Sequence, residues 1–278
     1  MSISESKIDE GQKTLNKLIY IDNIKVLLTI LVVLHHTFIA YSSSEGWYYN
    51  EPTAFRGAKL VMTMFVSVNQ SFFMGYFFLL SAYFTGSSYA KKGVLKFVNE
   101  RLTRLLVPVL FYSFILTPLI CYLVYYFTKQ HITLHKYLML YDSWIDLGVT
   151  WFLAALLIFT LVYVCFKQIF KISFDRPVAV PNVKIIILFA VGLGIISFLV
   201  RIVFPVGWVL APVGFQFGHF PQYIALFIIG LLAAKNNWFD QISDRVGRQL
   251  RRSALLCLLF FPVFFAIAVK LNTAINYF

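Results

Sequence analysis

Two adjacent histidines in an otherwise apolar run are the first residues of this chain that suggest chemistry. Asp22 and Lys25 are followed by nine apolar residues or threonines, and then by His35 and His36. Eleven residues of an α-helix turn through about 1100°, which is three turns plus about 20°. His36 and Lys25 therefore share one helical face, with Asp22 within about 40° of it and His35 about 80° away.

A neutral imidazole inside an apolar run can act as a general base, because a low-dielectric medium disfavours its charged form. We take His36 as the candidate base, with His35 and Asp22 as further candidate catalytic residues on the same helix. The alternative is a structural histidine that is hydrogen-bonded to a neighbouring helix. Metal binding is not expected, because adjacent helical residues diverge by about 100° and no carboxylate is placed at a similar depth.

A pair of arginines forms a second group of chemical interest. Arg101 and Arg104 lie three residues apart in the run from Phe97 to Pro108, so they should project together from the start of a helix at the cytoplasmic surface. Such a pair can grip phosphate oxygens, and a helix N-terminus adds a favourable dipole. The alternative is a pair of positive charges that only orients the chain in a membrane.

Polar groups also interrupt two other apolar runs. Asn69, within the second run, is expected either to join two helices by a hydrogen bond or to line a polar cavity. Arg201, near the outer end of the fifth run, is expected to extend its charge to the membrane interface.

The composition shows which elements must position these residues. Of the 278 residues, 60% are hydrophobic and 13% are charged, whereas soluble domains average about 45–50% and 25%. This excludes a soluble globule and a disordered chain, and indicates an integral membrane protein. The net charge of +12 does not indicate a nucleic-acid partner, because the basic residues cluster in short patches between apolar runs.

Seven runs approach the length of roughly 20 residues that a membrane helix needs. None of them alternates with the period of a membrane β-strand, so the predicted fold is an all-α bundle of about seven transmembrane helices. The runs are Ile24–Tyr41, Leu60–Phe84, Leu105–Phe127, Val149–Phe166, Ile185–Phe204, Phe220–Ala234 and Ala254–Leu271.

The distribution of basic residues predicts the orientation. With a cytoplasmic N-terminus, 18 of the 24 Lys and Arg residues fall at the cytoplasmic ends and loops. We therefore expect a cytoplasmic segment at residues 1–23, a multi-pass membrane domain at residues 24–278, and insertion in the cytoplasmic membrane. The last run stops almost at the end of the chain, which suggests that later helices are missing.

Five stretches in this order resemble the membrane-bound acyltransferase 3 family. They are the Asp22, Lys25 and His36 pattern, Phe77–Tyr83, the run from Arg101 through Arg104 to Pro108, Trp151–Leu153 and Gln222–Gly230. The resemblance extends from about Tyr20 to Phe239.

The resemblance implies an enzyme that takes an acyl group, often acetyl, from a cytoplasmic acyl-CoA donor. The acceptor would be a hydroxyl of an extracytoplasmic carbohydrate or cell-surface glycan. His36 would be the catalytic histidine, Arg101 and Arg104 would serve the donor, and Asp22 and Lys25 would orient the first helix or contact the donor. Direct transfer and a covalent acyl-histidine both remain open.

The chain departs from the family pattern at three points. Lys25 stands where the family usually has Arg, which keeps the charge but loses the planar fork. Ala82 replaces the usual Gly after Ser81. Family members generally have about ten helices, so the chain resembles a C-terminally shortened member.

A proton-coupled transporter is the alternative function. In such a protein His36 would relay protons, and Asp22 and Lys25 would act as gates. Inverted repeats with paired broken helices would favour it, and the sequence contains no such repeats.

Overall fold

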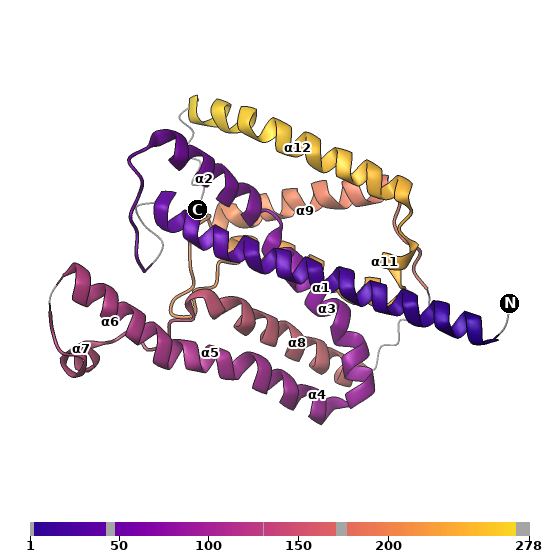
Figure 1. Ribbon diagram of the computed structural model, residues 1–278, viewed down its shortest axis with the longest axis horizontal. Helices are drawn as coiled ribbons and strands as arrows, with labels where there is room; N and C mark the ends of the chain where they lie inside the picture. The colour runs from indigo at the N-terminus through magenta and orange to yellow at the C-terminus, as the bar shows by residue number, and fades with distance from the viewer. Residues whose placement is uncertain (1–2, 43–47, 130, 171–176, 271–278) are drawn as a thin grey trace. The chain divides into compact units, whose positions relative to one another are not determined.

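The computed structural model describes residues 3–42, 48–129, 131–170 and 177–270, with side chains from Ile19 onward except those of residues 268 and 269. Helices make up 81% of the structure and no strand occurs in the described ranges, which confirms the predicted all-α class (Figure 1). The α-helices are α1 (Ile3–Ser42), α2 (Arg56–Gln70), α3 (Phe73–Lys92), α4 (Val94–Arg101), α5 (Val107–Phe111), α6 (Thr117–Thr128), α7 (Leu134–Leu140), α8 (Trp151–Phe170), α9 (Val183–Val203), α10 (Phe220–Lys235), α11 (Trp238–Gln241) and α12 (Asp244–Lys270). Short π-helical segments η1 (Leu102–Leu106) and η2 (Tyr112–Leu116), and 3₁₀ turns η3 (Gly148–Thr150) and η4 (Phe217–His219), connect some of them.

Seven helical segments of the described chain are long and apolar enough to cross a membrane, which confirms the predicted number. They are Ile19–Ser42, Arg56–Lys92, Val94–Thr128, Gly148–Phe170, Val183–Val203, Phe217–Lys235 and Asp244–Ile267. The third and seventh begin about ten residues earlier than predicted, because polar and basic residues continue the helix before its apolar part begins.

The chain divides into two compact units, Met1–Phe73 and Met74–Phe278. In the first unit, α2 lies along the C-terminal part of α1 (Figure 1). The Phe38 and Phe65 rings meet edge to face with centroids 4.9 Å apart. Asn69 Nδ2 donates a hydrogen bond to the carbonyl of Leu31 at 3.2 Å. This contact settles the role of Asn69 as an interhelical link.

The second apolar run is two helices rather than one. α2 ends at Gln70 and α3 begins at Phe73, with a turn at Ser71 and Phe72 between them. Ser71 Oγ donates a hydrogen bond to the carbonyl oxygen of Val68 at 2.6 Å. This bond satisfies one of the carbonyl groups at the C-terminal end of the helix. A helix broken within an apolar run brings backbone polar groups to membrane depth, which is tolerated only where protein or a cavity surrounds them.

Two proline residues shape the third membrane segment. η1 precedes Pro108 and η2 precedes Pro118. In each case the residue just before the proline bonds five residues back, from Val107 N to Leu102 O and from Thr117 N to Tyr112 O. The wider turn relieves the clash between a proline ring and the carbonyl four residues earlier, so the segment stays helical.

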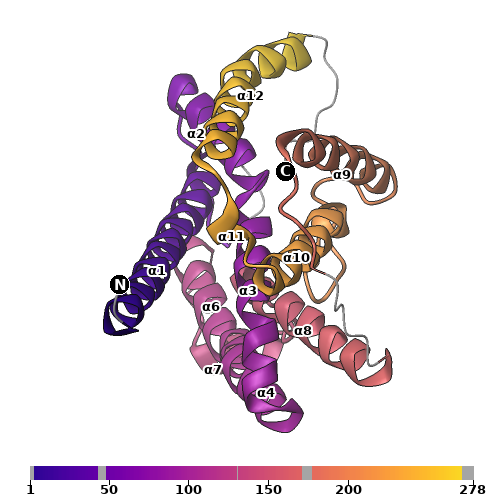
Figure 2. The same cartoon turned by 90° about the vertical axis from the view of Figure 1, so that its right-hand side faces the viewer.

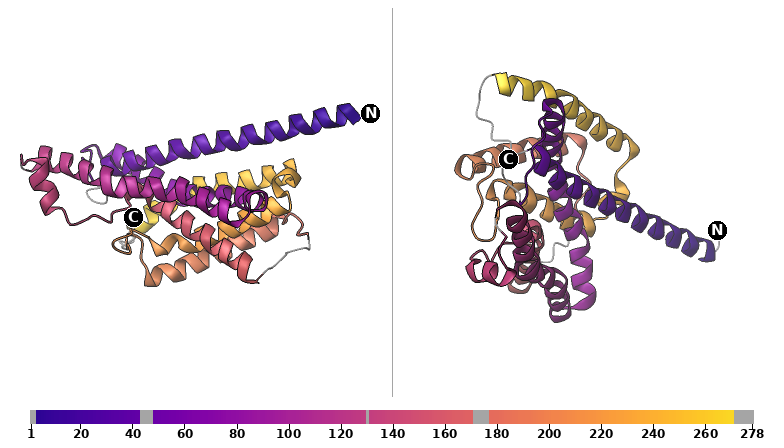
Figure 3. Two further views of the ribbon diagram at one scale, coloured as in Figure 1. Left: turned by 90° about the horizontal axis from the view of Figure 1, so that it is seen from below. Right: turned by 60° about the vertical axis from the view of Figure 1, so that its left-hand side comes forward.

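The helices α3, α8 and α10 meet in the second unit (Figure 2), and aromatic side chains pack between them. The Phe78 ring of α3 stacks on the Tyr223 ring of α10, with ring centroids 4.9 Å apart. It also contacts the Phe159 ring of α8, with centroids 5.0 Å apart. Trp151, at the start of α8, stacks on Tyr223 at 5.8 Å. Three of the stretches that resemble the acyltransferase family therefore pack together. Figure 3 shows the helices of this unit from two further sides.

Gly230 allows α10 to approach α3 closely. A Cβ atom at this position would lie 2.3 Å from the carbonyl oxygen of Leu79 and 2.8 Å from the Cβ of Ala82. Because the nearest atom belongs to the backbone, it cannot rotate away. Ala82 is fully buried at this contact, so the missing side chain of Gly230 makes room for the Ala82 methyl group.

We expect Gly230→Ala to lower the free energy of unfolding by about 1–3 kcal/mol or more through overpacking. Gly194→Ala on α9 is the matched control, because a Cβ at Gly194 meets nothing within 4 Å and Ala is the better helix former. Thermal unfolding of the purified proteins in detergent measures both effects. Equal melting temperatures for the two variants would contradict the close approach.

Candidate functional site

The described part of α1 has one buried seam with a seven-residue spacing. Ile21, Leu28, His35 and Ser42 are all buried, with exposed fractions of 1%, 2%, 5% and 2%. Seven helical residues turn through about 700°, so each residue in this series is rotated by only about 20° from the one before it. His35 thus belongs to the packing face of α1, and His36 is rotated by about 100° from it.

His36 lies beside this seam and is half-buried. Its Nδ1 is 2.8 Å from the carbonyl oxygen of Val32, one turn earlier. A carbonyl can only accept, so Nδ1 carries the hydrogen, and in the neutral ring the lone pair resides on Nε2. The Val32 carbonyl therefore selects the tautomer of His36 and orients its ring. A general base requires a hydrogen-bond partner of this kind.

His35 is held by packing. Its ring lies on Phe73 with centroids 4.8 Å apart and contacts His36 edge to face at 5.5 Å. Among the residues that the structure describes, the buried Nδ1 of His35 has no hydrogen-bond partner. The two histidines thus meet different surroundings, as their angular separation on the helix predicts.

Asp22 and Lys25 form an ion pair on α1, with Lys25 Nζ 3.0 Å from Asp22 Oδ1. Asp22 is exposed and Lys25 is half-buried. A pair three residues apart on an accessible helix contributes a few tenths of a kcal/mol. This geometry favours the orienting role for the pair over direct chemistry.

The prediction that Arg101 and Arg104 project from the start of a helix is wrong. α4 begins at Val94, after Gly93 adopts φ +72° and ψ 173°, a conformation that is essentially restricted to glycine. Arg101 ends α4 and Arg104 lies in the π-helical segment η1. Neither residue is therefore close to free helix N–H groups.

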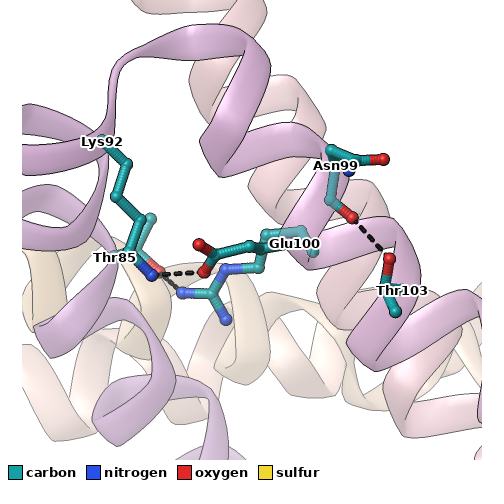
Figure 4. Close-up of polar contacts among 6 residues, drawn as sticks. Thr85, Lys92, Asn99, Glu100 and Thr103 are labelled. Carbon is teal, nitrogen blue, oxygen red and sulfur yellow. Dashed lines mark hydrogen bonds and ion pairs between the residues drawn. The ribbon is translucent and has the colours of Figure 1, made fainter.

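The two arginines also differ in their contacts. Arg101 is half-buried, donates from Nη2 to Thr85 Oγ1 of α3 at 3.2 Å, and lies 5.1 Å from the centroid of the Phe97 ring. Arg104 is exposed. Figure 4 shows the contact at Thr85 beside the ion pair between Lys92 and Glu100, which also joins α3 to α4.

Arg201, for which the sequence predicts a position at the membrane interface, forms contacts within the protein. Its Nε donates to the carbonyl of Gly218 at 3.2 Å and its Nη2 lies 3.1 Å from Nδ1 of His219. The arginine thus attaches α9 to the start of α10. Sequence inspection missed this link and the Thr85 contact of Arg101, because both join residues 16 or more positions apart without any local pattern.

Four of the six predicted site residues, Asp22, Lys25, His35 and His36, belong to the first unit, and the two arginines belong to the second. In the described ranges, no group of three or more His, Cys, Asp or Glu side chains is placed to hold a metal ion.

Comparison with known proteins identifies the family of this chain. The family model described as "Acyltransferase domain", that of the acyltransferase 3 family, matches residues 18–278. No curated protein and no solved structure matches the chain significantly. The family match covers all seven membrane-length segments and every predicted site residue. The chain belongs to the acyltransferase 3 family and is a membrane acyltransferase.

Proposed function

We propose that this acyltransferase moves an acyl group, most simply acetyl, from a cytoplasmic acyl-CoA donor to a hydroxyl of an extracytoplasmic carbohydrate. His36 is the general base in this proposal. The hydrogen bond from its Nδ1 to Val32 O is the observation that carries it. This bond leaves Nε2 as the nitrogen that can take a proton from the acceptor.

The reaction needs no group beyond the two substrates and the histidine. Nε2 of His36 takes the hydrogen of the acceptor hydroxyl as its oxygen attacks the thioester carbonyl. The carbon–sulfur bond then breaks, and the thiolate takes the proton from the imidazolium. The products are the ester and the free thiol. A positioned base of this kind typically contributes 10²–10⁴-fold to the rate.

The charged residues support the two ends of this reaction. Exposed Arg104 offers a planar fork to the phosphates of the donor. Arg101 holds α3 against α4 through Thr85, which positions the helix that carries Arg104. The ion pair between Asp22 and Lys25 orients α1, the helix that carries His36.

The distribution of basic residues supports the proposed orientation. With 18 of 24 Lys and Arg residues on one side, the positive-inside rule favours a cytoplasmic N-terminus and insertion in the cytoplasmic membrane. The arginines then face the compartment that holds acyl-CoA. Acyl groups reach the outer surface while CoA stays in the cell.

The proposed function predicts acyl transfer and no ion-driven uptake. Purified protein in proteoliposomes should move label from radiolabelled acetyl-CoA to a cell-surface glycan extract, with release of free CoA. The same vesicles with an imposed proton gradient should not accumulate glycan fragments faster than empty vesicles. Gradient-driven uptake without labelled ester would instead support the transporter.

A further inference from the structure

The second unit contains a pocket that none of the family motifs contributes to. Its volume is about 360 Å³, within the range of small-molecule sites. It lies between α6, the short helix α7 and the residues on either side of α7. The polar and aromatic side chains that line it are Tyr125, Tyr137, Tyr141, Asp142, Ser143 and Asp146.

Three tyrosine rings form a continuous aromatic wall in this pocket. Tyr137 contacts Tyr125 with centroids 5.6 Å apart and Tyr141 with centroids 5.7 Å apart. Burial raises the pKa of Tyr137 and of Tyr141, and the charge of Asp142 raises both further. The rings are therefore neutral phenols at physiological pH, and their faces carry the partial negative charge that attracts cations.

The pocket is acidic in a strongly basic chain. The whole sequence has a net charge of +12, yet two of its 12 acidic residues, Asp142 and Asp146, line this pocket, and none of the Lys, Arg or His residues that the structure describes does. Asp142 Oδ1 accepts from Ser143 Oγ at 3.0 Å, and Asp146 Oδ1 accepts from the backbone N of Gly148 at 2.8 Å. These bonds fix the direction of both carboxylates without neutralising their charge.

The chain itself shows what one of these rings attracts. The ammonium group of Lys129 lies 5.8 Å from the centroid of the Tyr125 ring, within the distance at which cation–π attraction operates. Lys129 does not line the pocket, so its ammonium group does not fill the pocket itself.

We propose that this pocket binds an organic ammonium group. Aromatic faces supply cation–π attraction and the two carboxylates supply the opposite charge, whereas an anion would be repelled. The group could belong to a free amine or to the head group of a membrane lipid. A lipid source is compatible with α7, whose Met139 and Leu140 are 73% and 72% exposed and suit contact with the membrane interface.

Titration with tetramethylammonium chloride tests the proposal. Trp144, one of five tryptophans in the chain, has its ring centroid 5.2 Å from that of Tyr141, so binding in the pocket should change the tryptophan fluorescence of the full chain in dodecyl maltoside micelles. We expect a saturable change beyond that caused by equal sodium chloride. Phosphatidylethanolamine in the micelles should weaken the response if lipid head groups enter the pocket, while phosphatidylglycerol should not. Equal responses with both lipids would indicate the free amine as the source.

Two substitutions localise the response. Asp146→Asn keeps an oxygen for Gly148 N but removes the charge, and Tyr137→Leu removes the central ring. Each should weaken tetramethylammonium binding by roughly tenfold. Asp244→Asn, at the start of α12 outside the pocket, loses the same charge and should bind normally. Asp142→Asn, at an exposed position, replaces Tyr137→Leu if that variant does not fold.

Several results would overturn the proposal. They are the absence of a saturable response in the wild type, unchanged binding in the pocket variants, or equal loss in Asp244→Asn. A response to glucose with none to tetramethylammonium would assign the pocket to a neutral sugar instead. None of these results depends on acyl transfer, so the proposal can fail while the proposed function holds.

Discussion

His36→Asn is expected to abolish acyl transfer while leaving the amount of protein in the membrane unchanged. Asparagine is compact and forms hydrogen bonds, but it cannot take a proton near neutral pH. The loss of a positioned base corresponds to a fall in kcat of about 10²–10⁴-fold. The measurement is transfer of labelled acetyl from acetyl-CoA at matched expression, with melting temperature as the check on folding.

His35→Asn is the control from the same turn of α1. His35 packs on Phe73 at the buried seam, so its replacement should lower stability more than His36→Asn does and retain more activity. Wild-type turnover in His36→Asn would remove His36 as the base. A greater loss of activity in His35→Asn than in His36→Asn, at equal amounts of folded protein, would move the assignment to His35.

Arg104→Lys is expected to raise the KM for acyl-CoA by roughly tenfold or more, with normal membrane insertion. Lysine keeps the positive charge that orients the segment but loses the planar fork that grips phosphate. Charge-assisted hydrogen bonds contribute about 1.5–3 kcal/mol each, so the loss of one has an effect of this size. Initial rates over a range of donor concentrations give the KM.

Arg101→Lys should behave differently, because Arg101 also contacts Thr85 and the Phe97 ring. We expect weaker donor binding together with a lower melting temperature. Thr85→Val removes the contact on the opposite helix and should reproduce only the loss of stability. An unchanged donor KM in both Arg104→Lys and Arg101→Lys would leave these arginines only a role in orienting the chain.

The sequence alone determined the number and class of the membrane segments. The length and apolarity of a run are local properties, and membrane insertion depends on little else. The relation between Asp22 and Lys25 also followed from helix geometry, and the structure has them as an ion pair. The family motifs were readable because they lie in the expected order along the chain.

Helix ends and breaks were less accessible to sequence reasoning. The turn that separates α2 from α3 consists of Ser71 and Phe72. Neither is a glycine or a proline, so nothing in this apolar run marks the break. The start of α4 at Val94 depends on the positive φ of Gly93, which a glycine permits but does not require. The prediction that a helix starts at Arg101 was therefore wrong, because the helix already begins at Val94.

Only the tertiary structure decided what each polar side chain contacts. Helix geometry separates His35 from His36 by about 100°, but it cannot tell which of the two faces a neighbour. The packing of α2 and Phe73 against α1 placed His35 in the buried seam. Likewise, the turn at Gly93 brought Thr85 to Arg101 across 16 residues. Such contacts arise from the packing of whole helices, and no short stretch of sequence encodes them.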